Sequence, residues 1–200
     1  CKKEDGQSPA GCPTKHNTQS VQESLEVYHD PGMHEFSRQA SIQESEGYGN
    51  KELGYAHLKP VKPRILEIAE FAHKMDYHRL GLVFCIGLSR EAQKVGGFFE
   101  QQGFEVVSVV CKVGRISKET IDLSDDQKLS PGSYESMCNP IAQAFVLNEA
   151  KTDFNILLGL CVGHDSLFLK HAQALCTVLA AKDRLLGHNP MAAVYLMDSY

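Results

Sequence analysis

The sequence predicts an α/β fold: a three-layer, Rossmann-like domain with a mainly parallel sheet, preceded by an N-terminal helical hairpin. From residue 62 onward, short apolar runs rich in strand-forming residues alternate with amphipathic helical segments. Capping residues, glycines and prolines separate these segments. Hydrophobic residues make up 42% of the 200 residues, which is ordinary for a globular protein and enough for a sizeable core.

The expected organisation has three parts. Residues 1–16 form a polar, cysteine-containing segment without periodicity, which has no core of its own and needs an external staple to be ordered. Residues 17–61 hold the N-terminal helices and a Gly-rich linker, with the helices at 18–46 interrupted at Pro31 and Gly32. Residues 62–200 form the α/β domain, and the whole chain is expected to be one compact unit.

The elements of the α/β domain are assigned from periodicity, Ser, Asn and Asp caps, and glycine at helix ends. Strands that alternate with helices imply right-handed βαβ units and a parallel sheet buried on both faces. One long irregular stretch, residues 112–137, joins the second strand to its helix, and connections of this length are uncommon unless functional. In chain order the expected elements are helix 62–75, strand 79–87, helix 89–103, strand 104–111, helix 139–150, strand 154–161, helix 164–174, strand 175–183 and helix 189–200.

Charge and hydropathy exclude several classes of function. The net charge is −5 and the 20 basic residues are scattered, so no nucleic-acid partner is expected. No apolar run approaches the roughly 20 residues that span a bilayer, and the first residues lack the apolar core of a signal peptide. We therefore expect no membrane association and a cytoplasmic location. The chain does not begin with Met, so residues upstream could complete a site at this end.

Cysteines fall at the ends of predicted strands. The chain has seven cysteines, an odd number unlike a secreted disulfide scaffold. Cys85, Cys111 and Cys161 end the first three strands, and Cys138 directly precedes a helix. The carboxyl ends of parallel strands share one edge, so these four thiols should converge there as ligands for zinc or an iron–sulfur cluster. The alternative for each cysteine alone is a small core residue, which is how we interpret Cys176.

Three stretches carry a resemblance: "CNPIAQAFVLN", "GLCVGHDSLFLKHA" and "AAKDRLLGHNP", together with the cysteine-containing N-terminal segment. The chain resembles the family catalogued as domain of unknown function eighteen-forty-seven over most of residues 1–195. Members are described as metal-binding proteins of anaerobic bacteria and archaea. The resemblance implies metal binding through cysteines and a cytoplasmic setting, and it implies no particular reaction.

Polar residues beside these thiols suggest further roles. His164 follows Cys161 and could act as a ligand, a proton donor or a partner of a ligand. Asp165 is a catalytic candidate whose alternative role is to cap the following helix. Ser89, at a helix N-terminus, and Lys182 could hold a small anion or cofactor together with His164. The chain has no G-x-G-x-x-G or P-loop, so nucleotide binding has no motif behind it.

Cys1 and Cys12, with His16, suggest a second metal site whose alternative is a tail with incidental thiols. For the chain as a whole, three functions remain open. The first is a metal-binding or iron–sulfur protein with redox or sensing work. The second is an enzyme with Cys161 as nucleophile and His164 as base. The third is a small-anion module with structural cysteines. A small-molecule or redox partner and a homo-oligomer are left open.

Overall fold

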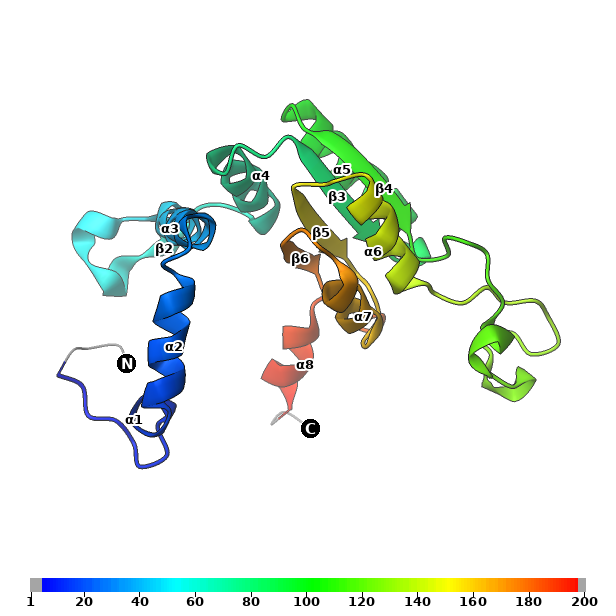
Figure 1. Ribbon diagram of the computed structural model, residues 1–200, viewed down its shortest axis with the longest axis horizontal. Helices are drawn as coiled ribbons and strands as arrows, with labels where there is room; N and C mark the ends of the chain where they lie inside the picture. The colour runs from blue at the N-terminus through cyan, green and yellow to red at the C-terminus, as the bar shows by residue number, and fades with distance from the viewer. Residues whose placement is uncertain (1–4, 198–200) are drawn as a thin grey trace. The chain divides into compact units, whose positions relative to one another are not determined.

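The computed structural model describes residues 5–197, and the chain divides into two compact units, Cys1–Pro63 and Arg64–Tyr200. Figure 1 traces the chain through both units. Cys1 lies outside the described residues. Within residues 5–197, no helix has the length and apolar character needed to cross a membrane.

The N-terminal unit is helical, as predicted. It comprises α1 (Pro13–His16), α2 (Thr18–Val27), α3 (Pro31–Glu46) and a short antiparallel ribbon of β1 (Tyr48–Gly49) and β2 (Lys59–Pro60). This ribbon and two 3-10 turns between its strands occupy the predicted linker.

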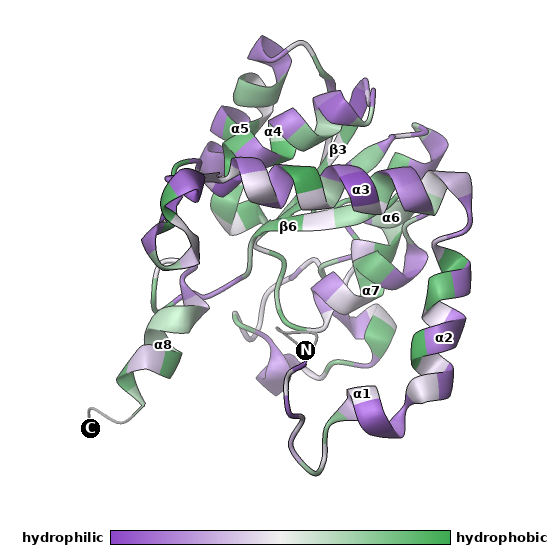
Figure 2. Cartoon of the chain, turned by 90° about the vertical axis from the view of Figure 1, so that its left-hand side faces the viewer, coloured by the Kyte–Doolittle hydropathy of each residue, from purple (hydrophilic) through white to green (hydrophobic). Residues whose placement is uncertain are grey.

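The arrangement of α2 and α3 differs from the expected antiparallel hairpin. The two helices run in steeply different directions in both views of the chain (Figures 1 and 2). Asp30 has extended backbone angles, and its carboxylate accepts a hydrogen bond from the Met33 N–H at 2.9 Å. The chain therefore turns sharply at Asp30 and α3 starts in a new direction. None of the residues of α2 is buried, and its apolar Val21 and Leu25 are 46% and 47% exposed.

The C-terminal unit contains the predicted parallel sheet. Its four strands are hydrogen-bonded in the order β4-β3-β5-β6, and every pairing is parallel. The strands are β3 (Arg79–Phe84), β4 (Glu105–Val110), β5 (Phe154–Leu158) and β6 (Cys176–Ala180), and the helices are α4 (Arg64–Lys74), α5 (Ser89–Gln101), α6 (Pro140–Glu149), α7 (His164–His171) and α8 (Pro190–Leu196).

Helices cover both faces of this sheet, which gives the expected three layers. On one face, Val83 of β3 and Leu157 of β5 pack with Leu147 of α6 and Phe168 of α7. On the other face, α5 lies so close that a β-carbon on Gly96 would lie 3.9 Å from Leu82 of β3. Because successive residues of a strand point to opposite faces, β3 contributes to both layers of the core. All five residues of β5 are buried, as expected for a central parallel strand.

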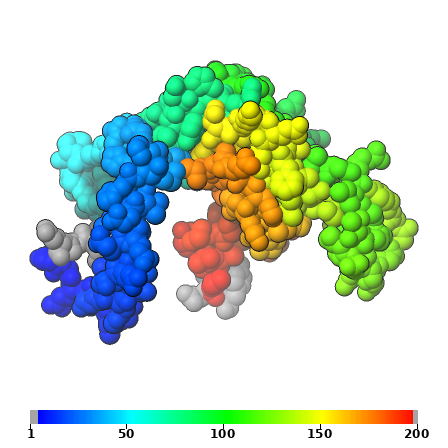
Figure 3. Space-filling model, in the orientation of Figure 1, coloured from blue at the N-terminus to red at the C-terminus, as the bar shows by residue number. Residues whose placement is uncertain are grey.

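The connection between β4 and α6, residues 112–137, is folded onto itself. An isolated bridge pairs Ser117 with Ser136, and two 3-10 turns lie between them. The Lys128 side chain is 5% exposed, and its ammonium pairs with the carboxylates of Glu119 and Asp125. Figure 3 shows the connection, in green, as a lobe beside the α/β layers. We call residues 112–137 the β4–α6 connection.

Gly81 tests the packing of the central strands. A β-carbon here would lie 2.1 Å from Oδ1 of the buried Asn155 and 2.5 Å from Cδ1 of Leu147. We expect Gly81→Ala to lower the free energy of unfolding by about 1–3 kcal/mol, because neither neighbour can move freely. The matched control is Gly97→Ala in α5, where nothing lies within 4 Å and alanine favours the helix by roughly 1 kcal/mol. Urea unfolding followed by circular dichroism measures both, and equal stabilities would contradict this packing.

Lys128 tests what orders the β4–α6 connection. Lys128→Met removes both ion pairs, so we expect proteases to cut within residues 112–137 severalfold faster at neutral pH. The control is Lys94→Met, at an exposed position of α5, which should leave the cleavage rate unchanged. Hydrogen bonds from Lys128 and Ser117 lower the pKa of Glu119 from 4.5 to about 2. The contribution of Glu119 is therefore complete above pH 4.5 and is lost as the pH falls toward 2. The difference between variant and native protein should shrink over that interval.

Candidate thiol site at the carboxyl edge of the sheet

The parallel sheet itself positions two of the predicted thiols. Cys85 and Cys111 are the residues directly after β3 and β4, and both continue the ladder of backbone hydrogen bonds. The Cys111 N–H donates to the Phe84 carbonyl at 2.9 Å, and the Cys85 N–H donates to the Leu158 carbonyl at 3.3 Å. β4 lies on one side of β3 and β5 on the other, so the direction of winding reverses beside β3. Ligands of open α/β sheets bind at such points.

The β4–α6 connection returns the chain to Cys111 and brings a third thiol. The N–H of Asn139 donates to the Cys111 carbonyl at 2.7 Å, and the Asn139 side chain caps α6 by accepting from the Ala142 N–H at 3.0 Å. Cys138 is thereby held against Cys111, with 3.7 Å between their Sγ atoms. We call Cys111 and Cys138 the dithiol pair.

The two thiols of the dithiol pair have different environments. Cys111 is buried, and the Ile86 N–H donates to its sulfur at 3.3 Å. The hydrogen bond with Cys138, together with burial, raises the pKa of Cys111. The same hydrogen bond lowers the pKa of Cys138, and the nearby charges of Lys112 and His164 lower it further. Of the two thiols, half-buried Cys138 is therefore the one that ionises more readily.

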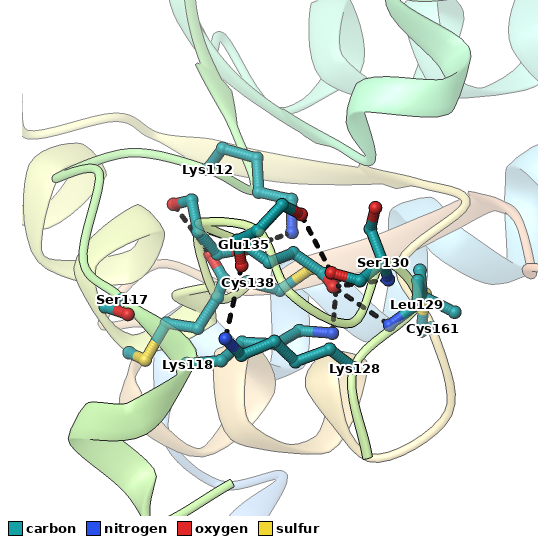
Figure 4. Close-up of polar contacts among 12 residues, drawn as sticks. Lys112, Ser117, Lys118, Lys128, Leu129, Ser130, Glu135, Cys138 and Cys161 are labelled. Carbon is teal, nitrogen blue, oxygen red and sulfur yellow. Dashed lines mark hydrogen bonds and ion pairs between the residues drawn. The ribbon is translucent and has the colours of Figure 1, made fainter. Parts of the chain in front are cut away.

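Lys112 follows Cys111 directly and is held beside Cys138. Its ammonium donates to the Ser136 carbonyl at 2.5 Å, which keeps the start and the end of the β4–α6 connection together (Figure 4). Cys85 also lies close enough to Cys111 to raise the pKa of that thiol when charged. Cys85 and Cys111 follow neighbouring strands and Cys138 lies against Cys111, so three thiols from three segments share the carboxyl edge with Lys112.

Cys161 has a separate partner. Its Sγ lies 2.9 Å from Nη2 of Arg184, a residue that follows β6. The Cys161 carbonyl accepts from the N–H groups of His164 and Asp165, which starts α7. The contacts of Cys161 thus join the ends of β5 and β6, while those of the dithiol pair join the ends of β3 and β4.

Two expected caps are wrong. The N-cap of α7 is Gly163, with φ at 82°, so Asp165 lies inside the first turn, and its carboxylate accepts from the Ser166 N–H at 2.8 Å. Gly163 replaces a side-chain cap because only glycine adopts this backbone conformation without strain. Ser89 is also not an N-cap, because a 3-10 turn at Ile86–Leu88 precedes α5. The Ser89 hydroxyl donates to the Ile86 carbonyl at 2.6 Å.

Two other predicted site residues, Lys182 and His164, also lie at the carboxyl edge of the sheet. The Lys182 ammonium would be 3.6 Å from a β-carbon on Gly87, which places it over the turn that follows β3. His164 lowers the pKa of Cys138, and its Nδ1 atom is buried with no hydrogen-bond partner among the described residues. Within residues 5–197, no three His, Cys, Asp or Glu side chains are gathered closely enough to hold a metal ion. The structure thus assembles the dithiol pair with Cys85 nearby, but not a complete ligand set of four.

The other predicted thiols lie elsewhere. Cys176 opens β6 and packs against the hydrophobic core, in agreement with its interpretation as a core residue. In the N-terminal unit, Cys12 is buried, and hydrogen bonds from Thr14 lower its pKa. The His16 ring lies 2.6 Å from the Ala10 carbonyl rather than against Cys12. A second metal site at Cys1, Cys12 and His16 stays a prediction.

Sequence reasoning missed two residues that shape the site. Lys112 is the cation beside Cys138, and its position directly after a strand-ending cysteine was the available signal. Gln143 is fully buried in α6, and its amide donates to the carbonyls of Val109 at 2.7 Å and Phe84 at 3.4 Å. A polar residue on the buried side of a short apolar helix could have indicated this role.

The fold and the site define a parallel α/β protein with a cluster of thiols at the carboxyl edge of its sheet. The chain belongs to the family described as "Protein of unknown function (DUF1847)", which it matches over residues 12–179. It is 46% identical over 134 residues to "Uncharacterized protein MJ0455" of Methanocaldococcus jannaschii, covering 67% of each chain. No solved structure matches it. The resemblance inferred from the sequence is therefore confirmed.

The spacing of the dithiol pair can be tested with a trivalent arsenical, which bonds to two neighbouring thiols at once. We expect the reduced chain to bind phenylarsine oxide and to become protected from alkylation at Cys111 and Cys138, because their sulfurs lie 3.7 Å apart. Cys138→Ser should lose this binding, while Cys176→Ser, at the other end of the sheet, should retain it. Arsenical binding that survives Cys138→Ser would show that another pair of thiols is the closer one.

Proposed function

We propose that the protein binds a soft metal ion or an iron–sulfur cluster through thiolates at the carboxyl edge of the sheet. Cys85, Cys111 and Cys138 are the core of the donor set, and Cys161 or His164 completes it. The 3.7 Å between the sulfurs of the dithiol pair carries the proposal. A cytoplasmic, reducing setting, in which such thiols stay available, is part of it.

The donor set fits the chemistry of zinc and of iron–sulfur clusters. Zinc binds thiolate sulfur at about 2.3 Å, and tetrahedral angles then place two sulfurs about 3.8 Å apart. The sulfurs of the dithiol pair, 3.7 Å apart, have nearly this spacing. Thiolates are required for ligation, and Lys112 supplies a positive charge beside Cys138.

Completion of the site would require Cys161 or His164 to join the pair. Cys161 would exchange its contact with Arg184 for the metal, and Arg184 would then remain as a cation beside a negatively charged thiolate cluster. His164 is an alternative donor because no residue from 5 to 197 hydrogen-bonds to its buried Nδ1 atom. Lys112 and Arg184 offset the charge that several thiolates bring to a half-buried site.

The bound group would determine the chemistry. Zinc would clip three loops together or act as a Lewis acid, whereas a cluster would transfer electrons. The cysteines would hold the bound group. The backbone hydrogen bonds of β3 to its neighbouring strands would fix the positions of Cys85 and Cys111, and Lys112 and Arg184 would offset the charge of the thiolates.

Elemental analysis after strictly anaerobic purification tests the proposal. We expect a stoichiometric amount of zinc, or of iron with acid-labile sulfide, in the native chain. Cys111→Ser and Cys138→Ser should each retain less than about a tenth of it, since loss of one ligand weakens a thiolate site by orders of magnitude. Cys176→Ser is the matched control and should retain all of it. Full retention in Cys111→Ser and Cys138→Ser would exclude the dithiol pair as ligands.

Arg184 favours a second candidate function, a thiol-dependent enzyme with Cys161 as nucleophile and His164 as base. A guanidinium 2.9 Å from the Cys161 sulfur would stabilise a thiolate there. In that case substoichiometric iodoacetamide should modify Cys161 first in the metal-free chain, and Arg184→Met should slow the reaction. Preferential modification of another cysteine, identified by peptide mapping, would count against this candidate.

A further inference from the structure

We propose that Cys111 and Cys138 form a dithiol–disulfide couple that a low-molecular-weight disulfide oxidises. The proposal rests on the placement of the two sulfurs and on the difference in their exposure. It assigns a covalent chemistry to the dithiol pair that is independent of any bound group.

The backbone geometry favours a bond between the two sulfurs. The two sulfurs lie 3.7 Å apart and would approach to about 2.05 Å when a bond forms between them. The hydrogen bond of 2.7 Å from the Asn139 N–H to the Cys111 carbonyl already holds the two chain segments together. The ladder bond from Cys111 to Phe84 anchors one side, so little of the backbone needs to move.

The difference in burial assigns the roles. Cys138 is half-buried, so a dissolved disulfide can reach its sulfur. Cys111 is only 3% exposed, so an external disulfide cannot reach it directly, whereas the Cys138 sulfur can. Cys138 is therefore the attacking thiol and Cys111 the resolving one.

The reaction balances with glutathione disulfide as the oxidant. The Cys138 thiolate attacks one sulfur of glutathione disulfide, the S–S bond of glutathione breaks, and one glutathione thiolate leaves. Cys111 then gives its proton to buffer base and attacks the Cys138 sulfur of the mixed disulfide. The second glutathione thiolate leaves as the Cys111–Cys138 bond forms. Two protein thiols are oxidised and one disulfide is reduced to two thiols.

The disulfide would also regulate the proposed metal site, and only this part rests on the proposed function. A disulfide removes two thiolate ligands at once, so the metal-bound and disulfide forms exclude each other. Metal would protect the pair from oxidation, and oxidation would release the metal.

The decisive experiment uses the full chain, reduced and stripped of metal by a chelator. It is incubated with glutathione disulfide, quenched with an alkylating reagent and analysed by intact mass and tryptic mapping. Several tryptic sites lie between the two cysteines, so their peptides stay joined only through a disulfide. We expect the native chain to lose two hydrogens and to yield the Cys111–Cys138 peptide pair.

Variants separate the two roles. Cys111→Ser should stop at the mixed disulfide, with one glutathionyl group on Cys138. Cys138→Ser should be oxidised at no more than about a tenth of the native rate, because buried Cys111 is then left without its partner. Cys138 is half-buried, so this variant is informative even if Cys111→Ser fails to fold. Cys176→Ser should behave like the native chain.

Two outcomes would overturn the couple. One is a glutathionyl group that persists on Cys138 in the native chain. The other is a Cys85–Cys111 disulfide as the main product, which Cys85→Ser would abolish. Retention of the Cys111–Cys138 link in Cys85→Ser supports the assignment.

A parallel experiment with zinc-loaded protein distinguishes the metal-binding proposal from the dithiol–disulfide couple. If both hold, zinc-loaded protein is oxidised more slowly, and a chromogenic chelator detects zinc as the disulfide forms. If the reduced chain binds neither zinc nor iron, the proposed function fails, while disulfide formation in the metal-free chain still supports the couple. Zinc that stays bound after complete oxidation would overturn its regulation by the disulfide.

Discussion

Strand β3 is hydrogen-bonded along both edges, and its ladder runs one residue past the strands themselves. The bonds from Cys111 to Phe84 and from Cys85 to Leu158 belong to that extension. A parallel sheet that is buried on both faces allows only one strand register. The positions of these two cysteines along the strand direction are therefore determined by the packing of the whole sheet. The backbone positions of two thiols thus depend on the central strands rather than on their own local interactions.

Gln143 ties this ladder to α6. Its amide N–H groups reach the carbonyls of Val109 and Phe84, one on each strand, near the point where both strands end. The amide oxygen is buried, with no hydrogen-bond partner among the described residues. A buried unpaired acceptor costs about 1–3 kcal/mol, so the carboxamide is retained against an energetic cost. α6, which starts two residues after Cys138, is thereby joined to the two strands that Cys85 and Cys111 directly follow.

The fold could be predicted from the sequence because apolar periodicity and the capping, glycine and proline residues at the ends of elements are local signals. The four parallel strands and the helices between them lie where alternation of apolar runs placed them, and three cysteines follow strands as expected. For the dithiol pair, the sequence predicted only that both thiols lie at the carboxyl edge of the sheet, and not that they are in contact. Its 3.7 Å spacing depends on the long return path through residues 112–137, which buried Lys128 and its carboxylates hold in shape. Neither Asp165 nor Ser89 is an N-cap. Gly163, with a positive φ, takes that position before α7, and a 3-10 turn precedes Ser89 at the start of α5. Residue preferences alone do not distinguish these arrangements from a side-chain cap.

The β4–α6 connection leaves the sheet at Lys112 and returns at Met137, so its two ends meet beside the dithiol pair. A loop with adjoining ends is topologically an appendage, because the rest of the chain is held together without crossing it. The entropic penalty of closing such a loop rises only slowly with its length. Evolution can therefore lengthen, shorten or exchange this lobe among relatives as a separable module, while the chemistry at its base stays in place.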